Sequence, residues 1–258
     1  MRVAFFGGIY NNYLALEAAL VDARRRGAEA IYCLGDVGGF GPHPDRSIEL
    51  LREHSIQMVQ GNYDDSVGNG RPDCGCGYTD PRDNHYAQIS YSYTVENTSS
   101  AHLPWLAALP PRREVEIDDK RFLMVHGSPR QVNEFLWETT SPDHLLESLA
   151  GEAGADTLLC THTGIHWQRR LPSGRRVVNV GALGRPANDG RTEVWYAWYD
   201  SAQPLPFTFV PVAYPYDRLA REMREENLPE EFVETINTGW WTTCLEILPA
   251  KERMRGKY

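Results

Sequence analysis

The chain has 258 residues, of which 41% are hydrophobic and 24% are charged. This composition is typical of a globular protein and excludes a disordered, collagen-like or coiled-coil chain. The formal net charge of −9 argues against a duplex nucleic-acid binder, which needs clustered positive charge, and no apolar run reaches the roughly 18 residues of a membrane span.

The recurring unit along the chain is a short apolar run of strand length that stops at Gly, Asp, Asn or His. Amphipathic stretches lie between several of these runs, at 13–26 and 44–54, with apolar residues three or four positions apart. Strands that alternate with helices predict an α/β fold built on a largely parallel sheet. The predicted strands are at 3–6, 30–34, 56–59, 122–125, 157–160 and 177–180.

Two stretches depart from this rhythm. Residues 68–78 are polar and glycine-rich, and with an irregular segment to Asn97 they are expected to pass over one edge of the sheet. Beyond Arg191, two alternating runs predict antiparallel strands at 195–199 and 207–212, and helices are expected from Asp217 to Asn227 and after Pro229. We therefore expect one domain over 1–258, with 213–258 as a helical tail packed on it.

Polar side chains follow four of the predicted strands: Asp36, Asn62, His126 and His162. Ligands of open α/β sheets bind beyond the carboxyl ends of the strands, so these four side chains are expected to converge. Gly-Asp and Gly-Asn are common in turns, and a lone histidine usually satisfies a hydrogen bond. Four such residues at matching positions, however, indicate a mixed oxygen and nitrogen site for Zn, Fe or Mn.

Four motifs carry a resemblance to a known family. The segments are GDVGGFGP at 35–42, GNYD at 61–64, HGSP at 126–129 and NVGALGRP at 179–186. In order and spacing they resemble the calcineurin-like metallophosphoesterase superfamily from residue 1 to about residue 212. The resemblance implies a four-layer αββα sandwich with a two-metal site at the strand ends.

The chain departs from the family pattern at three metal-binding positions. The family motif DxHGN corresponds to residues 8–12, where Gly8 replaces the aspartate and Tyr10 the histidine. The family motif GHTH corresponds to residues 161–164, where Gly164 replaces the second histidine. In the family these three positions all serve the first metal. The resemblance therefore implies one divalent ion (Mn, Fe or Zn) on Asp36, Asn62, His126 and His162, and a lost first site.

Four further residues are expected to act on the substrate. Tyr63 stands where many relatives have a histidine that donates to the substrate, so Tyr63 and Asp36 are the expected catalytic residues. Tyr10, Arg130 and Arg185 are expected to bind the substrate, although a surface role is equally open for the two arginines. Tyr10 is also expected to fill the vacated metal space, with its hydroxyl within hydrogen-bonding reach of Asp36 or of the water on the retained metal.

The number of cysteines, five, indicates where in the cell the protein is expected rather than a functional site. Their odd number makes a disulfide framework unexpected and favours a reducing cytoplasm. Cys74 and Cys76 form a CxC pair that offers a metal site or a redox pair, but loop packing is the favoured interpretation. The other three lie in apolar runs and are expected to be small core residues: Cys33, Cys160 and Cys244.

Two hypotheses about function follow. The first is a metal-dependent phosphoesterase of reduced activity that acts on a small phosphomonoester or phosphodiester with one metal ion. The second is a catalytically weak or inactive relative that binds a nucleotide or a partner protein; a third, weaker hypothesis gives the remaining metal a different chemistry. The expected partner is a small phosphate-containing ligand, with neither duplex nucleic acid nor a membrane.

Overall fold

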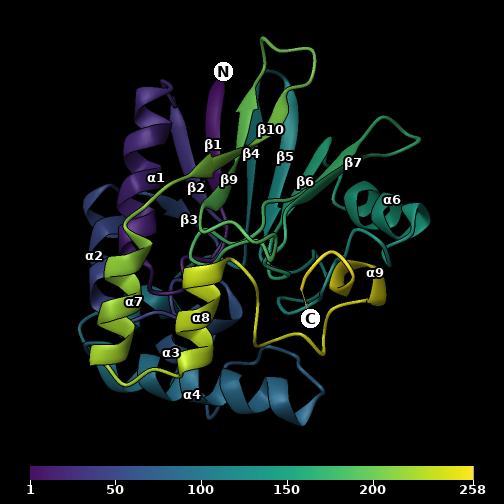
Figure 1. Cartoon of the computed structure of the whole chain (residues 1–258). Helices are drawn as coiled ribbons and strands as arrows, with labels where there is room; N and C mark the ends of the chain where they lie inside the picture. The colour runs from purple at the N-terminus through teal and green to yellow at the C-terminus, as the bar shows by residue number, and fades with distance from the viewer. Residues whose placement is uncertain (258) are drawn as a thin grey trace.

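A computed structural model describes residues 1–257, in which two five-stranded mixed sheets pack face to face between helices (Figure 1). The first sheet has the strand order β10-β9-β1-β2-β3. Strands β1, β2 and β3 are parallel to one another, whereas β9 is antiparallel to both of its neighbours, β1 and β10. The strands are β1 (Arg2–Phe6), β2 (Ala30–Cys33), β3 (Gln57–Met58), β9 (Val194–Asp200) and β10 (Phe207–Val212).

The second sheet has the strand order β4-β5-β6-β8-β7. Its central strands β5, β6 and β8 are parallel, and an antiparallel strand closes each edge. The strands are β4 (Arg112–Ile117), β5 (Lys120–Val125), β6 (Thr157–Cys160), β7 (Trp167–Arg170) and β8 (Arg176–Asn179).

The helices cover the outer faces of the two sheets and the end at which the parallel strands finish. In Figure 1, α1 and α2 lie outside the first sheet and α6 lies outside the second. The helices are α1 (Tyr13–Arg25), α2 (Pro44–Glu53), α3 (Asn62–Gly68), α4 (Pro81–Asn97), α5 (Leu103–Ala107), α6 (Asp143–Glu152), α7 (Tyr216–Glu225), α8 (Glu230–Thr238) and α9 (Ala250–Arg253). None of the helices described in 1–257 is long and apolar enough to cross a membrane.

The alternation of side chains along each central strand builds separate core layers. On β1, Val3 and Phe5 point into the core between the sheets, while Ala4 and Phe6 belong to the core under the helices of the first sheet. On β5, Phe122 joins the core between the sheets and neighbouring residues face α6. These layers confirm the four-layer α/β sandwich that the sequence resemblance implied.

Most predicted elements are present, but the structure corrects three expectations. The single sheet inferred from periodicity is a pair of sheets, and the edge strands β4 and β7 were not expected. The segment before Asn97 is not irregular but forms α4, because Pro81 occupies its first turn and Asp80 caps it by accepting from the backbone N–H of Arg82.

The C-terminal segment crosses from one side of the sandwich to the other. It leaves α8 near the first sheet and reaches α9 beside the second (Figure 1). A small apolar cluster of Trp137, Trp241, Leu245 and Leu248 fixes it against the loop after β5. This crossing brings the segment over the ends of the parallel strands.

His166 gives the fold a measurable acid sensitivity. It is largely buried against Trp195 of β9 and Phe209 of β10, with ring centroids 4.8 and 4.4 Å away, and burial lowers its pKa to about 4. An unfolded chain protonates this histidine near pH 6.5, so the unfolded state binds more protons between pH 6.5 and 4 and stability falls as the pH falls through that window. The contribution of His166 to that loss is about 3 kcal/mol.

We expect His166→Phe, which keeps a ring between the two aromatic neighbours, to flatten this dependence. Urea unfolding of both proteins between pH 7 and 4.5, in chelator, measures the difference in slope. Equal losses of stability in parent and variant would show that His166 does not titrate in this way.

Candidate metal centre

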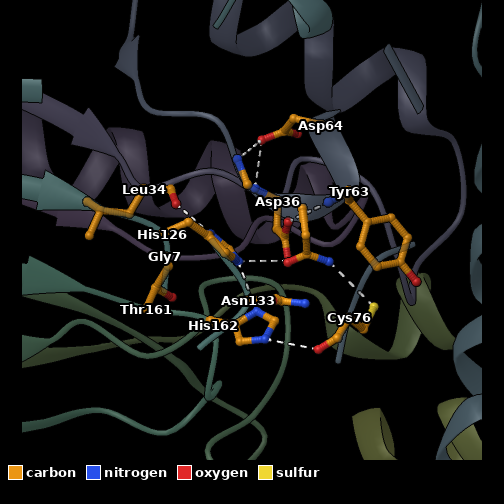
Figure 2. A network of polar contacts seen from close by, with 12 residues as sticks. Gly7, Leu34, Asp36, Tyr63, Asp64, Cys76, His126, Asn133, Thr161 and His162 are labelled. Atoms are coloured by element: carbon orange, nitrogen blue, oxygen red, sulfur yellow. Dashed lines mark hydrogen bonds and ion pairs between the residues drawn. The ribbon is translucent and has the colours of Figure 1, made fainter. Parts of the chain in front are cut away.

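Four predicted ligands lie where parallel strands end, and both sheets contribute. Asp36 follows β2, Asn62 begins α3, His126 directly follows β5, and His162 follows β6. Ligand atoms of Asp36, His126 and His162 all lie within 4.8 Å of one another, and the three residues are buried. Figure 2 shows the two imidazoles and the carboxylate pointing toward one another.

The backbone is unusual at two of these residues. Asp36 has φ 58° and His162 has φ 66°, in the left-handed region that residues other than glycine rarely adopt. Such conformations cost about 1–3 kcal/mol each and concentrate at functional sites. The fold therefore accepts strain in order to direct these two side chains inward.

Hydrogen bonds to carbonyl oxygens fix the orientation of both imidazoles. His126 donates from Nδ1 to the Leu34 carbonyl at 2.7 Å, and His162 donates from Nε2 to the Cys76 carbonyl at 3.2 Å. The remaining nitrogens, Nε2 of His126 and Nδ1 of His162, lie 3.1 Å apart. Nε2 of His126 is also 3.2 Å from Oδ2 of Asp36, so lone pairs and a negative charge converge on one point. A cation is needed there, either a proton or a metal ion.

The charges of the cluster agree with this geometry. Burial opposes ionisation of Asp36, but the charge and hydrogen bond of His126 outweigh it and lower the pKa of Asp36. Burial also favours a neutral His126, yet the Asp36 carboxylate raises the pKa of His126. Burial, reinforced by His126, lowers the pKa of His162 to about 3, so this imidazole stays neutral and offers a lone pair.

Asp64 supports the Asp36 loop from behind. Its carboxylate accepts the backbone N–H groups of Asp36, Val37 and Gly61 at 2.8–2.9 Å. Burial and the charge of Asp36 raise the pKa of Asp64 to about 6. The backbone N–H of Tyr63 holds Oδ1 of Asp36 at 3.0 Å and leaves Oδ2 toward the imidazoles.

Asn62 has one polar atom without a partner. Its amide nitrogen donates to the Cys74 carbonyl at 2.9 Å and to Sγ of Cys76 at 3.4 Å. Its Oδ1 is buried and makes no hydrogen bond within the described residues. An unsatisfied buried oxygen costs about 1–3 kcal/mol, whereas an amide oxygen is a suitable metal ligand. The residues present therefore fit a divalent cation with two oxygen and two nitrogen ligands.

Aromatic rings cover Gly8 and Gly164, two of the positions at which the family pattern has ligands of the first metal. A Cβ atom on Gly8 would lie 2.5 Å from Cε1 of Tyr10, and a Cβ on Gly164 would lie 2.9 Å from Cη2 of Trp241. The void lined by Tyr10, Gly164 and Trp241 has only about 20 Å³, which is space for about one water molecule.

Tyr10 fills the space beside Gly8 by a different route from the one expected. The sequence suggested an extended chain, but Tyr10 and Asn11 have φ 51° and 58°, and this turn folds the ring back over Gly8. Within residues 1–257 the Tyr10 hydroxyl makes no hydrogen bond to Asp36. Burial, with the nearby charge of Asp36, raises the pKa of Tyr10.

Restoring the family aspartate is therefore expected to destabilise the protein. Gly8→Asp places side-chain atoms too close to the Tyr10 ring. Overpacking of this kind lowers the free energy of unfolding by about 1–3 kcal/mol. In Gly8→Asp/Tyr10→His the smaller ring should recover much of that loss. Urea denaturation measures both variants, and equal stability of Gly8→Asp and the parent would contradict the contact.

A cavity of about 60 Å³ lies beside the cluster, with Asp36, His162 and Tyr10 on its wall. It has room for roughly four to six water molecules, and therefore for a phosphate-sized group and little more. Thr243 and Cys244, from the C-terminal segment, line it as well.

Arg185 enters the same cavity as a buried cation without a carboxylate partner. Its side chain is 6% exposed, and its guanidinium lies over the rings of Trp241 and Phe40, 4.0 and 4.9 Å from their centroids. One Nη donates to the Thr243 carbonyl at 2.8 Å, and Nε has no partner. Among residues 1–257 no carboxylate forms an ion pair with it. The cavity therefore has, next to the cluster, a buried positive charge that is not tied up in an ion pair.

Two other predicted site residues have different partners. The Tyr63 ring lines the cavity, but its hydroxyl donates to Oγ of Ser90 at 3.2 Å and points away from Asp36 (Figure 2), and burial raises the pKa of Tyr63. Arg130 is paired with Glu134 at the surface and does not line the cavity. The ion pair with Glu134, four residues along the chain, keeps Arg130 at the surface, and its contact with substrate stays a prediction.

The structure also adds residues that sequence reasoning missed. Cys74 and Cys76 form a disulfide, contrary to the expectation from the cysteine count. Their backbone carbonyls accept hydrogen bonds from Asn62 and His162, two of the predicted ligands. Trp241 and Thr243 complete the cavity from the C-terminal segment. Main-chain carbonyls and packing between distant residues leave no motif in the sequence, so these contacts were not predictable. The CxC pair was the one visible sign that this turn has a special role.

Comparisons with known proteins show a family match over most of the chain. The model of the calcineurin-like phosphoesterase superfamily domain matches residues 1–201. An uncharacterized protein of Methanocaldococcus jannaschii is 26% identical over 252 residues, which cover 92% of this chain and 98% of that protein.

Two solved structures are similar over nearly the whole chain. A metallophosphoesterase from Sphaerobacter thermophilus has a TM-score of 0.70 and 28% identity, with 93% of this chain and 99% of that chain covered. A hypothetical protein from Pyrococcus horikoshii OT3 has a TM-score of 0.78 and 23% identity, with the same coverage, and shares the fold.

Proposed function

Because the chain belongs to the calcineurin-like phosphoesterase superfamily, we propose that it hydrolyses a small phosphate ester with the help of one divalent metal ion. Asp36, Asn62, His126 and His162 would hold the ion. The observation that carries the proposal is the buried Oδ1 of Asn62, which has no hydrogen-bond partner. In the other three residues, the polar atom that faces away from the cluster already has a partner: Oδ1 of Asp36, Nδ1 of His126 and Nε2 of His162.

The donor set favours Mn, Fe or Zn as the ion. Two imidazole nitrogens with a carboxylate and an amide oxygen suit these metals better than Mg or Ca, which prefer oxygen ligands alone. Rings over Gly8 and Gly164 support a single ion, because they occupy the space that the side chains of a second site would need.

The protein groups divide the work of the reaction. When bound, the ion supplies a Lewis acid and lowers the pKa of water at the site. Asp36 stays ionised and His162 stays neutral, so both keep their lone pairs for the ion. Arg185 binds an anionic phosphoryl oxygen and stabilises the charge that develops on it. The small cavity favours esters with a small second substituent.

Metal content and turnover test the proposal together. The purified protein is loaded with Mn²⁺, desalted and analysed for metal, and phosphate esters from methyl phosphate to bis(p-nitrophenyl) phosphate are assayed. One ion per chain, with turnover of the smaller esters, is expected. Two tightly bound ions would refute the single-ion site, and one ion without any turnover would favour the binding-protein hypothesis.

A further inference from the structure

The turn Cys74-Gly75-Cys76, called here the CGC turn, lies directly behind the metal ligands. Its three successive carbonyls each accept a side-chain hydrogen bond. The donors are Nδ2 of Asn62 at 2.9 Å, Nδ2 of Asn133 at 2.8 Å and Nε2 of His162 at 3.2 Å. Two of these three donors belong to proposed metal ligands, and the third anchors the turn to the loop after β5.

The sulfur atoms take part in the same contacts. Cys74 and Cys76 form a disulfide and both are buried. Sγ of Cys76 accepts from the Asn62 amide at 3.4 Å, and Sγ of Cys74 accepts from the backbone N–H of Cys76 at 3.3 Å. Asn62 is therefore held by both a carbonyl and a sulfur of the turn, and this hold directs its Oδ1 away from the turn.

We propose that the CGC turn is a positioning element of the metal centre, and that its disulfide makes metal affinity depend on the thiol redox state. The inference rests on the metal site of the proposed function. The bond between the two sulfurs closes a small ring that fixes the directions of the carbonyls. Those carbonyls in turn fix which atom of Asn62 and which nitrogen of His162 face the ion.

The redox step is a thiol–disulfide exchange with a dithiol reductant. One thiolate of the reductant attacks a sulfur of the Cys74–Cys76 bond, which breaks and releases the other cysteine. The second thiol of the reductant then closes its own disulfide. The turn gains two electrons and two protons as two thiols, and the reductant is oxidised by the same amount.

Reduction is expected to weaken metal binding. The open turn can rotate its carbonyls, and the Cys76 sulfur is free to leave the Asn62 amide. Loss of an outer partner of a metal ligand typically lowers metal affinity by 10–100-fold. We expect at least a tenfold rise in the Mn²⁺ dissociation constant on reduction; Mn²⁺ is the appropriate probe because it has little preference for thiolates.

The test compares oxidised and reduced protein in one assay. Reduced protein is prepared with a dithiol that is removed under nitrogen, and alkylation should count two more thiols than in the oxidised protein. Electron paramagnetic resonance of free Mn²⁺ gives the dissociation constant in each state. The unfolding midpoint of the metal-free protein is followed as well, because a general loosening would lower it, whereas a change of positioning moves the dissociation constant of a folded protein.

Serine variants provide the controls. Cys74→Ser/Cys76→Ser should bind Mn²⁺ with the affinity of the reduced parent, whether or not it has been treated with the dithiol. Cys244→Ser removes a free thiol from the same cavity and should keep the full difference between the two states.

The outcomes separate this inference from the proposed function. Equal Mn²⁺ affinity of the oxidised and reduced parent, or oxidised-parent affinity in the double serine variant, would overturn the inference and leave the metal centre standing. Failure of Mn²⁺ to bind in either state would overturn both.

Discussion

His126→Ala is expected to abolish metal binding and phosphoesterase turnover together. His126 Nε2 is the atom shared by the contacts with Asp36 and His162, so its loss removes a ligand and separates the other two. The affinity loss should exceed the 10–100-fold cost of removing an outer partner. The stabilisation that the ion gives the folded state, about 2.7 kcal/mol at one hundred times the dissociation constant, should disappear as well.

Metal analysis and thermal unfolding with and without Mn²⁺ provide the readouts. Because the alanine variant leaves Asp36 buried without its partner, His126→Gln is the second variant, which retains hydrogen-bonding capacity there. His144→Ala, at an exposed position of α6, is the matched control and should behave like the parent. A His126 variant that is stabilised by Mn²⁺ as strongly as the parent would place the ion elsewhere.

Arg185→Met is expected to weaken phosphate binding without destabilising the fold. Methionine keeps an apolar chain between Phe40 and Trp241 but removes the charge and the hydrogen bond to Thr243. Hydrogen bonds to charged groups contribute about 1.5–3 kcal/mol, so the inhibition constant of inorganic phosphate should rise by roughly 10–100-fold. Replacing a buried charge by a well-packed apolar group is often neutral or stabilising.

The combination of weaker phosphate binding and unchanged or higher stability distinguishes a binding role from a structural one. Phosphate inhibition and urea unfolding measure the two quantities on the same protein. Arg221→Met, which breaks a surface ion pair with Asp217 on α7, should change neither by a comparable amount. If Arg185→Met loses stability and keeps its phosphate affinity, the arginine acts only in packing.

The parts of the fold that were predictable are those in which one stretch of sequence decides the structure. Central strands such as β1 and β6 are apolar after their first residue because they are buried on both faces, and the helix at 13–26 has a clear apolar stripe. Edge strand β4 has four charged residues among its six and is half exposed, so its strand signal is weak. The length of α4 was missed because its many tyrosines, serines and asparagines have low intrinsic helix propensity.

The same distinction applies to the metal centre. Asp36 and His126 were recognisable because their side chains follow strands and carry chemistry in themselves. The support for His162 and Asn62 comes from main-chain carbonyls of the CGC turn, and a carbonyl has the same chemistry at every residue. The pairing of two sheets, which brings His126 next to Asp36, depends on side chains that are far apart in sequence.

The position of Trp241 and Thr243 in the chain has a consequence for how the cavity can change. Both contact Arg185, yet both lie outside residues 1–201, which match the family model and include all four proposed metal ligands. The proposed metal centre and part of the cavity wall that limits the size of the substrate thus lie in separate segments of the chain. Substitutions in the C-terminal segment can therefore change the size of the substrate that the cavity accepts, while the residues at the strand ends stay the same.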